Sequence, residues 1–143
     1  MKTAWLVLGM FLPVFLSSIG GYGLRYNGSE SLPHSLYVSS LVKPSDFVLG
    51  QFVAFKMPQG TAMFAKKIAG VPGDLIEVKE KVVYVNGQEQ ATVLEKYASI
   101  EGGIIPDGHY FMLGEHVKSF DSRYFEFGLV PQELIREKLC PIF

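Results

Sequence analysis

The sequence predicts a mainly β domain that follows one apolar amino-terminal segment, and three observations predict this class. The mean hydropathy of +0.22 is high for a chain with 19% charged residues, so apolar residues should be concentrated in one segment. That segment lies at the amino end, where residues 3–24 carry no charge. The 119 residues that remain of the 143 contain short runs rich in Val, Phe and Tyr, separated by turn residues, as in a single β-rich domain.

The amino-terminal segment is long enough to cross a bilayer. About 20 helical residues span the hydrocarbon layer, and 22 uncharged residues lie between Lys2 and Arg25. Pro13 and several Ser and Gly residues limit the strongly apolar run to residues 4–16, which also suits a signal peptide. We therefore expect residues 1–25 to be a membrane anchor, with a cleaved signal segment as the alternative. A buried core helix is disfavoured, because no charged residue marks a solvent face.

The domain that follows begins with alternating strand and turn signals. Three successive strands are predicted by the β-branched and aromatic runs at residues 36–42, 47–57 and 62–68. Residues 74–78 and 81–85 flank a tight turn, and the dipeptide Asn86-Gly87 is typical of a second one. These two turns predict a β meander.

The rest of residues 26–143 completes the predicted β-rich domain. Residues 88–108 are polar and contain glycine, which predicts a small excursion from the β core. Residues 109–114 form a further strand-like run, whereas residues 132–138 have the most helical character. We see no internal repeat and no low-complexity segment.

Composition excludes several function classes. The chain has 13 Lys and Arg against 14 Asp and Glu, so its formal net charge of −1 leaves no basic surplus for nucleic acid. Cys140 is the one cysteine of the sequence, which excludes an intramolecular disulfide framework and a cysteine-rich zinc site. Stability must therefore come from packing.

Three polar motifs follow the apolar segment in a definite order. They are Ser31-Leu-Pro-His-Ser-Leu-Tyr37, then Lys66-Lys-Ile-Ala-Gly-Val-Pro-Gly-Asp74, then Ser119-Phe-Asp-Ser-Arg-Tyr124. This order resembles the signal peptidase I family of serine proteases, and the first motif resembles its conjugative-transfer, TraF-type branch. The resemblance covers nearly the whole chain. It implies a signal-peptidase-type antiparallel β-sheet catalytic core preceded by one transmembrane helix.

The resemblance implies that Ser31 is the nucleophile and that Lys66 is its general base. A serine hydroxyl attacks only when a neighbouring base removes its proton, and a lysine with a pKa near ~10.4 is almost entirely protonated at neutral pH. Burial among apolar groups lowers that pKa. On a strand, Lys66 shares its face with Phe64 and Ile68, so we expect it to be buried, whereas Lys67 points the other way into solvent.

Further roles follow from the same resemblance. Ser29 lies two residues before Ser31, and its hydroxyl would join the Ser31 backbone N–H as an oxyanion hole. In the third motif, Ser119 would orient the amine of the base, and Asp121 and Arg123 would form a supporting ion pair.

The chain departs from the family pattern at three places. Ser35 replaces the usual glycine, which removes easy access to positive φ. Glu115-His116 replaces the common Asp-Asn, and two extra residues precede Gly128. We expect the loop after Arg123 to be shaped differently as a result.

The resemblance implies a serine endopeptidase anchored in the inner (cytoplasmic) membrane, with its catalytic domain facing the periplasm or cell exterior. Its partner would be a precursor polypeptide, in particular a conjugative pilin precursor. Water would release the acyl-enzyme, or the amino terminus of the substrate would do so and give a circular pilin; the sequence does not choose between them. This chemistry needs no metal and no cofactor.

Other readings of the same residues carry less weight. Each motif alone is typical of linkers, exposed lysine pairs or ordinary turns, and the order of the motifs favours the protease. An inactive, membrane-anchored β module in pilus assembly remains an alternative. A self-cleaving regulator of the LexA type is disfavoured by the membrane segment and by the lack of a DNA-binding portion. We also disfavour a triad using His116 and Asp121, and a metal site at His109 and His116.

Overall fold

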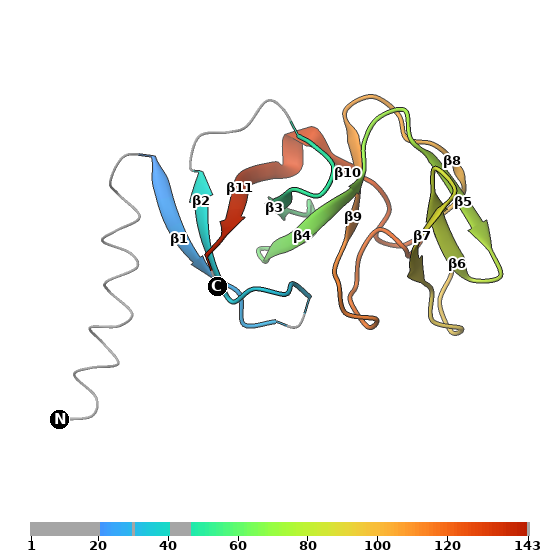
Figure 1. Ribbon diagram of the computed structural model, residues 1–143, viewed down its shortest axis with the longest axis horizontal. Helices are drawn as coiled ribbons and strands as arrows, with labels where there is room; N and C mark the ends of the chain where they lie inside the picture. Colours follow the sequence, from blue (N-terminus) through green and yellow to red (C-terminus); the bar gives the residue numbers. More distant parts are fainter. Residues whose placement is uncertain (1–20, 30, 41–46, 143) are drawn as a thin grey trace.

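The computed structural model describes residues 21–29, 31–40 and 47–142, which form two antiparallel β-sheets (Figure 1). The larger sheet has seven strands in the order β1-β2-β11-β3-β4-β9-β10. Their bounds are β1 Tyr22–Tyr26, β2 Leu36–Ser40, β3 Phe52–Lys56, β4 Met63–Gly70, β9 His109–Leu113, β10 Val130–Pro131 and β11 Ile135–Pro141. The smaller sheet has the order β7-β6-β5-β8, with β5 Leu75–Lys79, β6 Val82–Val85, β7 Gln88–Thr92 and β8 Gly103–Ile104. The chain is therefore mainly β, as the sequence predicts.

Side-chain alternation gives the larger sheet apolar contacts on both faces. In β3, Val53 and Phe55 belong to one buried cluster, whereas Ala54 belongs to another, which also contains Tyr37 and Leu139. β3 pairs with β4 so that Val53 lies opposite Lys66 and Phe55 opposite Phe64. A strand buried on both sides leaves little freedom in register. This register places the lysine of the second motif in the middle of the sheet.

The predicted helical character of residues 132–138 is wrong. Gln132–Leu134 form one 3₁₀ turn, and from Ile135 onward the chain is β11, which lies between β2 and β3. Ile135, Glu137 and Leu139 are buried at every second position, which is the period of a strand. Pairing on both sides outweighs the helix propensity of the Glu, Lys and Leu residues in this segment.

The meander β5-β6-β7 is present where the sequence predicts it. Glu80 and Lys81 have positive φ of 49° and 66°, and Asn86 and Gly87 have 51° and 79°, so both hairpin turns have two residues in the left-handed region. The excursion of residues 88–108 is structured, because it supplies β7 and β8 to the smaller sheet.

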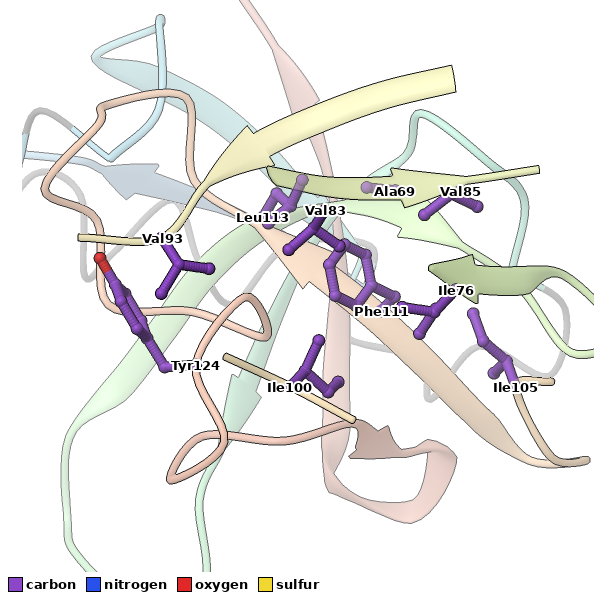
Figure 2. Packing of buried hydrophobic residues seen from close by; sticks show 10 residues of the cluster. All are labelled: Ala69, Ile76, Val83, Val85, Val93, Ile100, Ile105, Phe111, Leu113 and Tyr124. Carbon is purple, nitrogen blue, oxygen red and sulfur yellow. The ribbon is translucent and has the colours of Figure 1, made fainter. Parts of the chain in front are cut away.

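A shared apolar cluster joins the two sheets (Figure 2). Ala69, Phe111 and Leu113 enter it from β4 and β9 of the larger sheet. The smaller sheet contributes side chains from β5 and β6, namely Ile76, Val83 and Val85. Phe111 and Val83 are fully buried there. The cluster therefore fixes the smaller sheet against the part of the molecule that holds the polar motifs.

Only the last residues of the predicted amino-terminal segment fall within the described part of the chain. Tyr22, Gly23 and Leu24, placed by the sequence in the apolar segment, belong to strand β1. The expected membrane anchor falls mostly on residues 1–20, which lie outside the described residues. Among the residues that are described, no helix is long and apolar enough to span a membrane.

Candidate active site

The two adjacent lysines of β4 lie in different environments. Lys66 has 4% of its surface exposed, and its Nζ donates a hydrogen bond of 2.7 Å to Ser119 Oγ. Lys67 is about one-third exposed, and its Nζ pairs with Glu115 Oε1 at 2.8 Å. Because neighbouring strand residues point to opposite faces, one lysine enters the protein and the other remains at the surface.

Burial lowers the pKa of Lys66 below the usual range of a lysine. The Asp121 carboxylate opposes this shift because it favours the charged amine, and the Arg123 guanidinium adds to it by repulsion. Removal from water is the largest of the three effects. The neutral amine, which is the form able to accept a proton, is therefore more populated than in an exposed lysine.

A buried ion pair shapes the loop that carries Ser119. Asp121 has no exposed surface. Its carboxylate accepts hydrogen bonds from Arg123 Nε at 2.7 Å and from Arg123 Nη2 at 2.9 Å. It also accepts the Gly114 N–H at 2.9 Å. Arg123 donates further to the carbonyls of Gly114 and Val117, both at 3.1 Å, and to Thr92 O at 3.3 Å. This bidentate pair closes the loop against the end of β7.

Gly114 and Ser122 are structural parts of the site that the sequence did not single out. A Cβ at Gly114 would lie 2.0 Å from Ser119 Oγ, so a larger residue would displace the hydroxyl that binds Lys66. Ser122 holds the loop to β9, because its Oγ accepts the Met112 N–H at 3.0 Å and its N–H donates to Met112 O at 2.9 Å. The repeated serine in the third motif was the available signal for Ser122.

The loop that carries Ser31 is docked against the Ser119 loop. The Ser31 carbonyl accepts the Glu115 N–H at 2.8 Å, and the neighbouring Leu32 is buried. Ser31 itself is half-buried. Ser31 and Lys66 line the same cavity of about 750 Å³, while the hydrogen bond of the Lys66 amine is made to Ser119. Segments far apart in the sequence are thus brought to one site.

Ser29 lies next to Ser31, but its hydroxyl is engaged. The Ser31 N–H donates to Ser29 Oγ at 3.4 Å, and Ser29 Oγ donates its own proton to Asn27 Oδ1 at 2.7 Å. The two groups expected to form an oxyanion hole are therefore adjacent and face each other. Asn27 is a residue of the site that sequence reasoning missed, since nothing in its spacing distinguishes it from a linker residue.

Matches to known proteins identify the family. The chain matches the family described as signal peptidase, peptidase S26, over residues 2–141. The chain belongs to this family.

Curated members of the peptidase S26 family share part of the chain. Signal peptidase I V of Bacillus subtilis is 32% identical over an alignment of 91 residues, and the match covers 51% of this chain and 54% of that protein. Signal peptidase IB of Staphylococcus aureus is 31% identical over an alignment of 98 residues, with 53% of this chain and 50% of that protein covered. Probable signal peptidase I-2 of a Synechocystis species is 38% identical over an alignment of 74 residues, with 49% of this chain and 33% of that protein covered. The chain therefore spans between a third and about half the length of these relatives.

A solved structure gives a similar match. The crystal structure of a signal peptidase I from Enterococcus faecalis is 25% identical, with a TM-score of 0.48, and the match covers 67% of this chain and 98% of that one.

The cavity of this S26 chain has apolar walls and a free strand edge. Its walls include Tyr37, Ala54 and Ala65, and the Arg25–Glu137 ion pair also lines it. β9 pairs with β4 only from Lys67 onward, so residues 63–66 have no strand partner on that side among the described residues. An extended peptide can add to such an edge through backbone hydrogen bonds.

His116 and His109 each have a backbone group within hydrogen-bond distance of Nδ1. Both carboxylate oxygens of Asp121 accept hydrogen bonds from Arg123. His116 Nδ1 lies 3.1 Å from the Lys118 N–H, and His109 Nδ1 lies 3.0 Å from Asp107 O. Across the described ranges, no group of three His, Cys, Asp or Glu side chains is placed to hold a metal ion.

Proposed function

We propose that this chain is a serine endopeptidase in which Ser31 is the nucleophile and Lys66 the general base. The observation that carries the proposal is the buried Lys66 amine, which is bonded to Ser119 and opens to the cavity that Ser31 lines. A buried lysine with a lowered pKa is suited to accept a hydroxyl proton near neutral pH.

The reaction has two steps. Lys66 Nζ takes the Ser31 hydroxyl proton while Ser31 Oγ attacks the scissile carbonyl carbon. When the C–N bond breaks, the same proton passes from Lys66 to the leaving amine, and an ester remains on Ser31. Water then attacks the ester and gives a proton to Lys66, which returns it to Ser31 as the carboxylic acid product leaves. If an amine attacks instead of water, a new peptide bond forms.

The supporting residues act through position and charge. Ser119 holds the amine, and Asp121 and Arg123 fix the loop that carries Ser119. Ser29 and the Ser31 N–H would stabilise the oxyanion once the Ser29 hydroxyl turns towards it. No step uses a metal or cofactor.

The substrate we propose is a secreted precursor polypeptide. Its chain would extend along the free edge of residues 63–66, and small side chains before the scissile bond would lie against Ala54 and Ala65. The family relatives are named signal peptidases, which supports a precursor as the substrate class. Residues 1–20, which precede β1 in the sequence, would hold the enzyme in the inner membrane, with the catalytic domain facing the periplasm or cell exterior.

We further propose that the precursor is a conjugative pilin. Support comes from the first motif, whose serine, proline and final Leu36-Tyr37 fit the conjugative-transfer pattern. The excursion of residues 88–108 forms only two short strands and leaves room for no large second domain. This is consistent with an enzyme of narrow substrate range.

The test compares pilin mass in cells that carry the wild type, Ser31→Ala, Lys66→Met or Lys67→Met. Lys67→Met is the matched control, because this side chain lies on the other face of β4. Full-length precursor with the first two variants, and shortened pilin with the wild type and the control, is the expected result. A product lighter than linear pilin by one water indicates cyclisation. Shortened pilin with all four removes the protease assignment for this substrate and favours the inactive assembly module.

A further inference from the structure

Asn27 makes several hydrogen bonds beside the candidate nucleophile. Its Oδ1 accepts both the Ser29 N–H at 3.2 Å and the Ser29 hydroxyl at 2.7 Å. Its Nδ2 donates to Ser29 O at 3.0 Å and to His34 O at 3.3 Å. Its backbone N–H donates to Ser35 O at 2.8 Å. One side chain therefore ties the two arms of the loop that contains Ser31.

The bond from Ser29 has a direct consequence for oxyanion binding. A serine hydroxyl has one proton to donate, and in this structure Ser29 donates it to Asn27 Oδ1. The Ser29 oxygen meanwhile accepts the Ser31 N–H at 3.4 Å. Both expected oxyanion donors are thus satisfied inside the loop before a substrate is bound.

The backbone bonds explain how Ser29 can change partner without losing its place. If the hydroxyl rotates towards a developing oxyanion, the Ser29 N–H and carbonyl still bind Asn27. Rotation about the Cα–Cβ bond of Ser29 would thus change the partner of its hydroxyl while these two backbone bonds remain. Asn27 also lines the cavity shared by Ser31 and Lys66, so it lies where this exchange occurs.

We propose that Asn27 is a positioning residue for the oxyanion hole, which holds the Ser29 backbone in place and accepts the hydrogen bond of the Ser29 hydroxyl until the oxyanion forms. This inference rests on the proposed protease function. Asn27 touches no reacting atom in this scheme and acts through Ser29. Its removal should therefore lower kcat, because the donor is misplaced when charge develops, and leave KM almost unchanged.

The experiment is a double-mutant cycle in the full-length chain in detergent micelles. The variants are Asn27→Ala, Ser29→Ala and the double mutant, with Ser31→Ala as the test of the protease function itself. The substrate is a fluorogenic peptide with an Ala-x-Ala cleavage sequence. Ser29→Ala should lower kcat about 10²-fold or more, the usual cost of one oxyanion donor. Asn27→Ala should lower kcat about 10-fold or more, and the double mutant should match Ser29→Ala within about threefold, because non-additivity marks residues that act together.

A second measurement separates this role from loop stability. Asn86→Asp is the control, because Asn86 also bonds through its side chain, to Leu75 N–H and Asp74, but in the smaller sheet. The urea midpoint of each variant is compared with its kcat per folded molecule. We expect Asn86→Asp to shift the midpoint and leave kcat unchanged, whereas Asn27→Ala lowers kcat.

The outcomes are distinguishable. Non-additive losses in kcat with KM within about threefold support the role of Asn27. Losses that multiply in the double mutant overturn it while the protease function stands, as does an Asn27→Ala variant whose activity per folded molecule equals that of the wild type. Full activity in Ser31→Ala overturns the proposed function and this inference with it.

Discussion

The loop of residues 114–123 and the meander β5-β6-β7 are neighbours, but different interactions hold them. The meander places Ile76, Val83 and Val85 in an apolar cluster, and its turns are formed by adjacent residues (Figure 2). The buried side chains of the loop are mainly polar, and their partners include Lys66 of β4, Thr92 of β7 and Met112 of β9. An apolar region loses stability in proportion to the atoms removed, whereas a buried polar network depends on each of its members.

Asp121→Ala in the loop, compared with a control in the meander, should give the largest difference in stability loss between the two regions. The free energy of unfolding should fall by about 3–5 kcal/mol, because the variant leaves the Arg123 guanidinium buried without its counter-charge. The control in the meander is Glu77→Ala, which removes an exposed pair with Lys79 and should change stability by less than about 1 kcal/mol. Urea denaturation measures both, and equal losses would contradict the comparison.

Gly114→Ala tests the loop by adding one methyl group. Its Cβ would meet Ser119 Oγ at 2.0 Å. We therefore expect the free energy of unfolding to fall by up to about 3 kcal/mol and the peptidase activity to drop strongly. The matched variant is Gly70→Ala, whose Cβ would meet Ile105 Cδ1 at 2.6 Å and Phe111 Cβ at 3.0 Å, two residues of the apolar cluster that do not line the cavity of Ser31 and Lys66. Gly70→Ala should retain activity per folded molecule. The rate of peptide cleavage per folded molecule, measured for both variants, tests this difference. Retained activity in Gly114→Ala would refute the steric argument.

Val83→Ala tests the apolar region alone. Val83 is fully buried in β6, and loss of its two methyl groups should cost about 2 kcal/mol through transfer and cavity terms. Because Val83 does not line the cavity shared by Ser31 and Lys66, kcat should stay within about twofold of the wild type. Parallel urea and cleavage measurements test this, and a tenfold loss of kcat would show that the two regions are coupled.

Lys66→Met should change the pH dependence of stability. The pKa of Lys66 is lowered in the folded chain, so between this pKa and the ordinary lysine value the unfolded chain binds more protons. The free energy of unfolding therefore rises with pH in that window, by at most about 1.4 kcal/mol per pH unit for one group. We expect the variant to gain stability relative to the wild type below this window and to lose that advantage above it. Urea midpoints from about pH 6 to about pH 10 test this slope, and identical curves would contradict it.

The sequence predicts most of the fold where side-chain period and turn chemistry are local. The runs rich in Val, Phe and Tyr correspond to β2, β3 and β4, the strand-like run at residues 109–114 corresponds to β9, and the Asn86-Gly87 turn is present. The opposite directions of Lys66 and Lys67 also follow from strand geometry alone. By contrast, the β character of Ile135–Pro141 depends on strands about 80 and 100 residues earlier, and no local pattern contains that information.

The residues of the candidate site likewise fall into those that the sequence predicts and those that only the fold reveals. The motifs select Ser31, Lys66 and Ser119, and the structure places all three around one region. Asn27 and Gly114 escaped the sequence argument because their importance comes from distances to other segments. An asparagine in a polar loop has many ordinary roles, and a glycine before a loop resembles any turn. Contacts across the fold, rather than residue type, distinguish them.

The position of β11 bears on the order of assembly during synthesis. This strand lies between β2 and β3 (Figure 1), and the described chain supplies it last, from Ile135 to Pro141. Ribosomes release the amino-terminal strands first, so the β1-β2 hairpin and the β3-β4 pair exist for a time as separate pieces with unpaired edges. Leu139 and Glu137, which line the cavity, belong to β11. Until β11 has been made, the cavity of a nascent chain is incomplete, and the open edges of β2 and β3 are a transient aggregation hazard.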